Sequence, residues 1–125
     1  MAPKNTVVLW KDIHEVAQVI CKYYGLTYSK IIPETRKLAK HYGECQPCDK
    51  CWNAEHIDER NCSDKILSIR VHQLNRPRRA LATSTILRTL AHELAHLREW
   101  DHGKAHTAFE EEIVAYMKEL GYDVI

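Results

Sequence analysis

Residues 85–97 have the sequence TILRTLAHELAHL, and the expected fold is built outward from this stretch. Apolar residues recur along it at spacings of three and four, at Leu87, Leu90, Leu94 and Leu97. That spacing is typical of one buried face of an α-helix. His92 and His96 are four residues apart, so a helix would present both imidazoles to one point. We therefore predict an amphipathic helix from Ile86 to about Trp100 that carries a pair of metal ligands.

The same stretch contains the pattern His92-Glu93-x-x-His96, which is the zinc-binding pattern of many metallopeptidases. Glu93 lies beside the two histidines on the helix, close enough to reach a water on the metal without binding the metal itself. A glutamate in that place acts as the general base. The prediction is a catalytic zinc site with His92 and His96 as ligands and Glu93 as catalytic base.

A catalytic zinc ion usually has three protein ligands, and three candidates for the third follow the helix. His102 stands just before Gly103, where the chain can turn back toward the metal. His106 lies one helical turn later. A glutamate of the run 110–112 would give a site with two histidines and one glutamate, although negative charge is also favoured at a helix N-terminus.

The flanking segments predict an α+β fold. Helical spacing extends from about Leu9 to Tyr24 and ends at Gly25, and a last helix is expected from about Thr107 to Leu120. Residues 28–32 favour a short strand stopped by a proline. Residues 65–72 alternate apolar and polar side chains, which is typical of a half-buried strand.

Four of the five cysteines fall close together, at Cys45, Cys48, Cys51 and Cys62. Clustered thiols in a reducing compartment favour a metal site over disulfides, and four thiolates suit a tetrahedral structural zinc. The alternatives are His56 in place of one cysteine, an iron–sulfur cluster, or free thiols or a disulfide. The surrounding residues 43–63 are rich in Pro, Asn and Asp, so we expect a loop-rich, cysteine-containing insertion that a structural zinc would order.

Length and composition limit the class of protein. The 125 residues predict one domain, 1–125, and 45% hydrophobic with 28% charged residues is the balance of a globular protein. No apolar run is long enough to cross a membrane, and no secretion signal is evident, so an intracellular, cytoplasmic location is expected, with nucleus or nucleoid as alternatives. The net charge of +1 implies no strong attraction to nucleic acid, although residues 76–79 form a basic loop.

The stretch from Thr85 to Leu97, together with Trp100–Asp101–His102–Gly103 and Phe109, resembles the SprT-like, YgjP-like and WLM group of small zinc metallopeptidases. This resemblance covers residues 65–122 well and the first helix loosely. It implies a compact zincin domain with a short mixed or antiparallel sheet beside the active helix. It also implies His102 as the third ligand. The group usually has an aromatic residue where this chain has His106.

The resemblance further implies hydrolysis of peptide bonds in protein substrates, including proteins bound or crosslinked to DNA, with single-stranded DNA as a partner. In such enzymes the substrate lies along an exposed strand edge, and residues 66–72 are the candidate strand. Tyr116, Tyr122 and His72 are candidates to assist the zinc in stabilising the oxyanion. The rival interpretation is a zinc-stabilised module that binds nucleic acid or protein without catalysis.

Overall fold

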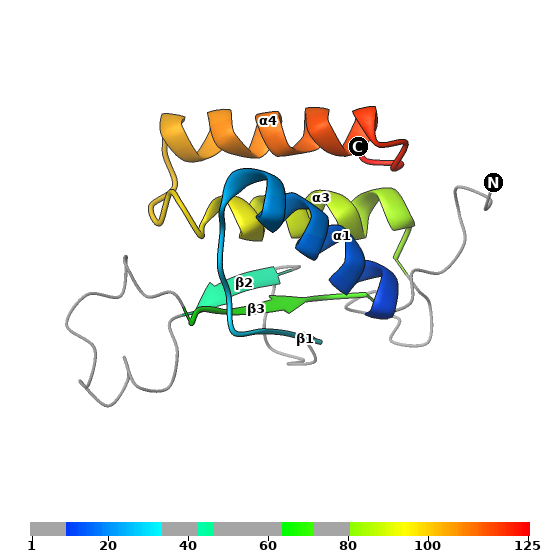
Figure 1. The fold of residues 1–125 in the computed structure, drawn as a ribbon, viewed down its shortest axis with the longest axis horizontal. Helices are drawn as coiled ribbons and strands as arrows, with labels where there is room; N and C mark the ends of the chain where they lie inside the picture. Colours follow the sequence, from blue (N-terminus) through cyan, green and yellow to red (C-terminus); the bar gives the residue numbers. More distant parts are fainter. Residues whose placement is uncertain (1–9, 34–42, 47–63, 72–80) are drawn as a thin grey trace.

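The computed structural model describes residues 10–33, 43–46, 64–71 and 81–125. Its elements, in chain order, are α1 (Trp10–Tyr24), β1 (Lys30–Pro33), β2 (Gly43–Gln46), β3 (Ile66–Ile69), α3 (Thr83–Ala95) and α4 (Lys104–Glu119) (Figure 1). The predicted α+β class is confirmed, with a helix before the sheet and two helices after it.

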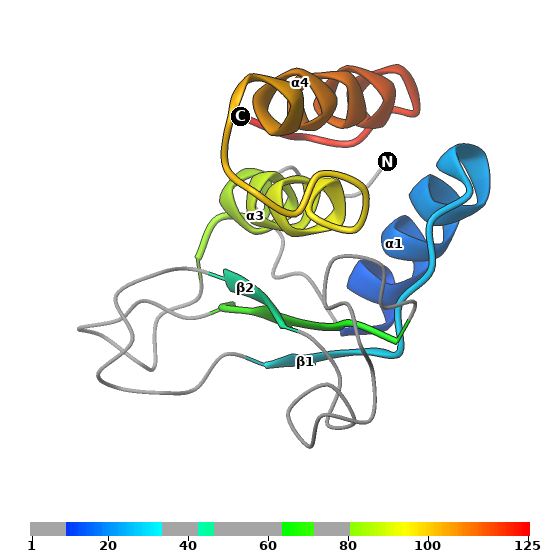
Figure 2. The ribbon, with the colours of Figure 1, turned by 90° about the vertical axis from the view of Figure 1, so that its left-hand side faces the viewer.

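The elements form layers, with the sheet on one side and the helices stacked above one of its faces (Figure 2). Helix α3 occupies the centre, because it contacts β2, β3, α1 and α4. Helix α4 lies on the side of α3 away from the sheet, and α1 runs beside α3. The helix that carries His92 and Glu93 is therefore held from several directions.

The sheet is mixed, as expected, and its strand order is β1-β3-β2. Strand β3 pairs parallel with β1, in the register Ile31 to Leu67, and antiparallel with β2, in the register Cys45 to Leu67. Two expectations are corrected here. Residues 43–46 form a strand where a loop was expected, and β3 is buried along its whole length instead of half-buried.

The core lies between the sheet and the three helices. Helix α3 contributes its apolar face, with Leu90 and Leu94 fully buried, and Leu67 and Ile69 of β3 pack beneath it. Helices α1 and α4 supply Ile13, Ala17, Ile20, Phe109, Ile113 and Met117. None of the helices in the described segments is long and apolar enough to cross a membrane.

The helix ends depart from the expected ones at α3 and α4. Helix α1 ends as predicted, with Gly25 at φ +69° and the Leu26 N–H donating to the Cys21 carbonyl at 2.9 Å. Helix α3 stops at Ala95 and not near Trp100, and its N-cap is Ala82, without a side-chain hydrogen bond. Helix α4 begins at Lys104, three residues before the expected start, and residues 96–103 connect α3 to α4.

Candidate metal centre

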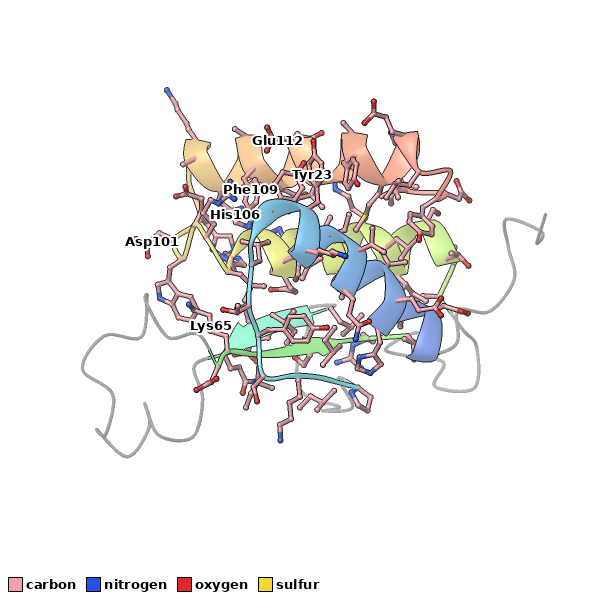
Figure 3. All side chains as sticks on the ribbon, viewed as in Figure 1. Tyr23, Lys65, Asp101, His106, Phe109 and Glu112 are labelled. Atoms are coloured by element: carbon pink, nitrogen blue, oxygen red, sulfur yellow. The ribbon has the colours of Figure 1, made fainter. Side chains whose placement is uncertain are left out.

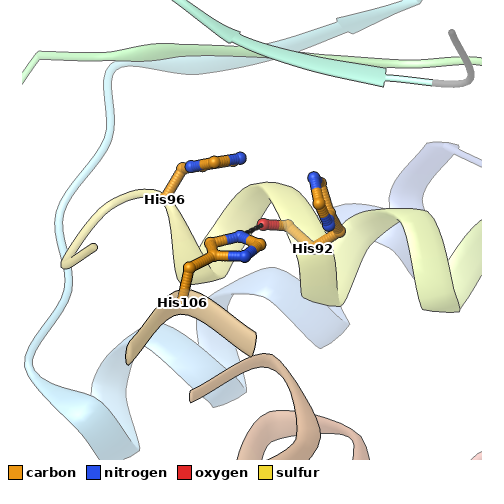
Figure 4. A group of neighbouring side chains, drawn as sticks. All are labelled: His92, His96 and His106. Carbon is orange, nitrogen blue, oxygen red and sulfur yellow. Dashed lines mark hydrogen bonds between the residues drawn. The ribbon is translucent and has the colours of Figure 1, made fainter. Parts of the chain in front are cut away.

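His92 lies in the last turn of α3 and His96 is the C-cap residue of that helix, and both rings lie on the side that faces the sheet (Figure 4). Leucines on the same helix are buried in the core and hold it in place, because a rotation about the helix axis would expose them. His96 is buried and His92 is half-buried, and their ring centroids lie 4.9 Å apart. The histidine pair that the spacing predicted is thus presented side by side.

His102 returns to this pair through the turn after α3. Its Nε2 lies 3.3 Å from the Nε2 of His92 and 3.1 Å from the Nε2 of His96. Zn–N bonds of about 2.0–2.1 Å in a tetrahedron place the ligand nitrogens about 3.3 Å apart. The two distances to His102 therefore match the spacing that one zinc ion requires.

The other ring nitrogen of each helix histidine is already engaged. His96 Nδ1 lies 3.1 Å from the Glu99 carbonyl and 3.0 Å from the Trp100 carbonyl. Carbonyl oxygens only accept, so Nδ1 must carry the proton and, in the neutral ring, Nε2 keeps its lone pair. His92 Nδ1 donates in the same way to Glu110 Oε1 at 2.6 Å. Both rings are therefore in the tautomer that a metal ion bound through Nε2 needs.

His106 reaches the same neighbourhood from α4, on the far side of α3 from the sheet (Figures 3 and 4). His92, His96 and His106 form a group whose ligand atoms lie within 4.8 Å of one another and that could hold one metal ion. The Nε2 of His106, however, lies 3.0 Å from the His92 backbone carbonyl and must donate to it. Its ring stacks on His96 with a centroid separation of 4.0 Å.

The three glutamates at 110–112 have different surroundings. Glu110 binds His92 and also accepts from Arg88 Nε at 2.8 Å, while Glu111 pairs with the same arginine and Glu112 is exposed. Burial raises the pKa of Glu110, but the hydrogen bonds from His92 and Arg88 outweigh it and lower the pKa overall. Glu110 is consequently an ionised partner of the His92 ring.

Glu93 is 4% exposed and contributes to the cavity beside the histidines. Burial raises the pKa of its carboxyl to about 8, and the charges of Glu44 and Glu110 add to the effect. Burial lowers the pKa of His96 to about 4, with further contributions from His106, His92 and His102. Burial also lowers the pKa of His92, against its hydrogen bond to Glu110, so both helix rings favour the neutral form that binds metals.

A cavity of about 470 Å³ opens over these side chains. Its lining residues are Gly43, Glu44, Cys45, His92, Glu93, His96, Trp100 and His102. Strand β2 thus forms one wall and the end of α3 the other. Sequence reasoning missed Gly43 and Glu44, because no local pattern shows that residues 43–46 pair with β3 and face α3. Trp100 is named within the resemblance, without a place in the cavity.

Two expectations about the substrate side are corrected. The strand expected to bind substrate, residues 66–72, contains β3, which lies between β1 and β2 and is not an edge; in the described sheet the edge beside the cavity is β2. Tyr116 and Tyr122 do not line the cavity and pack against the core instead, and Tyr116 stacks on Tyr23 at 4.1 Å. His72 lies outside the described residues.

The cysteine cluster is described only at its first member. Cys45 lies in β2 and lines the cavity, whereas Cys48, Cys51 and Cys62 lie outside the described residues, as does the basic loop 76–79. A structural zinc on the four cysteines therefore stays a prediction. Cys21, outside the cluster, is buried, and burial raises the pKa of its thiol to about 12.

The fold and the site together define an α+β protein with a cluster of histidines that could hold a metal ion. Comparisons of the chain with models of known protein families, with curated proteins and with solved structures find no match.

Proposed function

We propose that the chain is a zinc-dependent endopeptidase, with His92, His96 and His102 as zinc ligands and Glu93 as the catalytic base. The observation that carries the proposal is the convergence of three imidazole Nε2 atoms, with distances of 3.3 and 3.1 Å to His102, in a cavity that also contains a buried carboxylate. The resemblance of residues 85–103 to SprT-like metallopeptidases points to the same chemistry.

The third ligand is assigned to His102 and not to His106 on three grounds. His102 lines the cavity with the other two histidines, whereas His106 does not and is 2% exposed. The Nε2 of His106 is occupied by the His92 carbonyl. His102 is exposed at the mouth of the cavity and offers its Nε2 at the spacing of a zinc ligand.

Bound zinc would lower the pKa of a coordinated water and polarise the scissile carbonyl. The positive charge of a bound zinc ion would favour the ionised form of Glu93. In that form Glu93 would remove the proton from the attacking water and deliver it to the leaving amine. Its burial excludes solvent that would otherwise compete for that proton, and its position next to His92 on α3 keeps it close to the metal without making it a ligand. A structural site has no need of a carboxylate in this position.

The substrate is proposed to be an extended peptide that lies along β2. In the described sheet β2 is the edge strand that forms a wall of the cavity, whereas the other edge strand, β1, does not line it, so a strand added to β2 would pass over the histidines and Glu93. Only the family resemblance suggests that the substrates include proteins bound or crosslinked to DNA. The test below therefore includes a substrate crosslinked to single-stranded DNA.

The test compares the wild type with Glu93→Gln on a protein crosslinked to single-stranded DNA and on the same protein free. The variant is expected to bind one equivalent of zinc at the histidine site and to lose cleavage by roughly 10²–10⁴-fold, because only the general base is removed. Glu112→Gln, which alters an exposed carboxylate on α4, is the matched control and is expected to cleave normally.

Equal cleavage of both substrates would support the peptidase activity and would contradict a role for DNA in it. No cleavage by folded, zinc-loaded wild type, on either substrate, would favour a zinc-stabilised binding module over an enzyme.

A further inference from the structure

We infer that α4 positions the metal ligand His92 through two side chains, His106 and Glu110, and that neither of them is itself a ligand. The inference rests on the proposed ligand set and extends it. His106 and Glu110 are four residues apart on α4, so they occupy one face of that helix, and both make contact with His92.

Glu110 holds the ring of His92. Its Oε1 accepts from His92 Nδ1 at 2.6 Å, and its Oε2 accepts from Arg88 Nε at 2.8 Å. Both carboxylate oxygens are thereby engaged, and the side chain is only 13% exposed. Arg88 is in turn fixed by Glu111 and by the Ile125 carbonyl, the latter at 2.8 Å. A carboxylate held in this way orients the ring and fixes its tautomer.

His106 holds the backbone of His92. At the end of α3 the helix tightens, since the His96 N–H donates to the Glu93 carbonyl at 3.1 Å, three residues back. In a continued α-helix that N–H would instead donate to His92. The ring N–H of His106 donates to the His92 carbonyl at 3.0 Å and so supplies a partner for it (Figure 4).

Helix α4 is rigid enough for this role. Its inner face is packed in the core, with Ile113 and Met117 fully buried and Phe109 6% exposed. His92 is consequently fixed at two points, the ring Nδ1 and the backbone carbonyl, and its Nε2 is aimed into the cavity. Loss of such a supporting contact typically costs about 10–100-fold in metal affinity.

The test of Glu110 measures zinc affinity by chelator competition, without substrate. Glu110→Ala is expected to weaken zinc binding about 10–100-fold while one ion still binds and the visible spectrum of the Co²⁺ form keeps its wild-type shape. Glu110→Gln keeps an oxygen that can accept from Nδ1, so it is expected to recover part of the loss. Glu112→Ala, on an exposed position of α4, is the matched control. Unchanged affinity in both Glu110 variants would overturn this role.

His106 is tested by His106→Phe, which keeps an aromatic ring but removes the donor, beside His102→Ala. The His106 variant is expected to bind one zinc with affinity lowered about 10–100-fold and a Co²⁺ spectrum like that of the wild type. His102→Ala is expected to change that spectrum and to weaken zinc binding further, because a ligand is lost. The reverse pattern, with the Co²⁺ spectrum altered by His106→Phe and not by His102→Ala, would overturn the inference and make His106 the ligand.

The metal readouts separate this inference from the proposed activity. If the wild type binds zinc and cleaves nothing, the peptidase fails while the positioning of His92 can still be measured. If it cleaves but Glu110 and His106 variants bind zinc like the wild type, the peptidase stands and the positioning role fails.

Discussion

Gly43 brings the backbone of β2 unusually close to the flank of α3 that carries Thr89 and Glu93. A Cβ atom added there would lie 2.7 Å from Thr89 Cγ2, 2.9 Å from Glu93 Oε2 and 2.9 Å from the Ser68 carbonyl oxygen. The last of these is backbone in the central strand and cannot move aside. Any other residue at this position therefore has to push β2 away from both α3 and β3.

We predict that Gly43→Ala destabilises the protein by about 1–3 kcal/mol, the usual cost of overpacking, and displaces Glu93. Cleavage is then expected to fall more steeply than zinc binding, because the altered contact is with the proposed base, Glu93, and not with a proposed ligand. The measurements are thermal unfolding, zinc affinity and initial rates. Gly103→Ala is the control, since its added Cβ would meet nothing within 4 Å; equal effects of the two changes would contradict the prediction.

Some residues of the candidate site could be predicted from the local sequence, and others could not. The spacing of His92, Glu93 and His96 follows from the helical repeat alone, and the structure places the three on α3 or at its C-cap as expected. Gly43 and Glu44 meet the site only through a strand pairing with residues far along the chain. The role of His106 depends on a carbonyl contact between two helices. Neither kind of contact has a local sequence pattern.

At the scale of elements, some ends of helices follow from the local sequence, whereas other ends and one strand depend on contacts with residues elsewhere in the chain. Gly25, at φ +69°, ends α1 as predicted, and Gly121, at φ +94°, closes the turn after α4, because the left-handed conformation favours glycine. Helix α3 ends five residues early, and there the carbonyls of Glu99 and Trp100 accept from the ring of His96. Strand β2 lacks β-branched residues and exists through its pairing with β3.

At the scale of the element, we predict that Ile113→Ala loosens α4. Ile113 is fully buried, so its truncation is expected to lower the free energy of unfolding by about 2–4 kcal/mol. Zinc affinity is expected to fall with it, because α4 carries the contacts to His92. Urea unfolding of the chelator-treated protein gives the first quantity. Thr107→Ala, at an exposed position of the same helix, is expected to change stability by less than about 0.5 kcal/mol.

For the whole molecule, zinc is expected to stabilise the fold, since the proposed ligands link the end of α3 to the turn that leads into α4. An ion that binds only the native state adds about 2.7 kcal/mol at a concentration one hundred times its Kd. Unfolding is therefore expected to shift to higher temperature with zinc and back with a chelator. His92→Ala and His96→Ala should abolish the part of the shift that comes from this site. If the zinc-induced shift in unfolding temperature persists unchanged in both variants, the shift comes from zinc bound at another site.

The turn that carries His102 has a consequence for how the ion arrives. Two of the proposed ligands are oriented by hydrogen bonds that need no metal, and the third stands exposed at the rim of an open cavity. In the proposed site, an ion from solvent would therefore pass the exposed His102 and meet two rings that are already oriented.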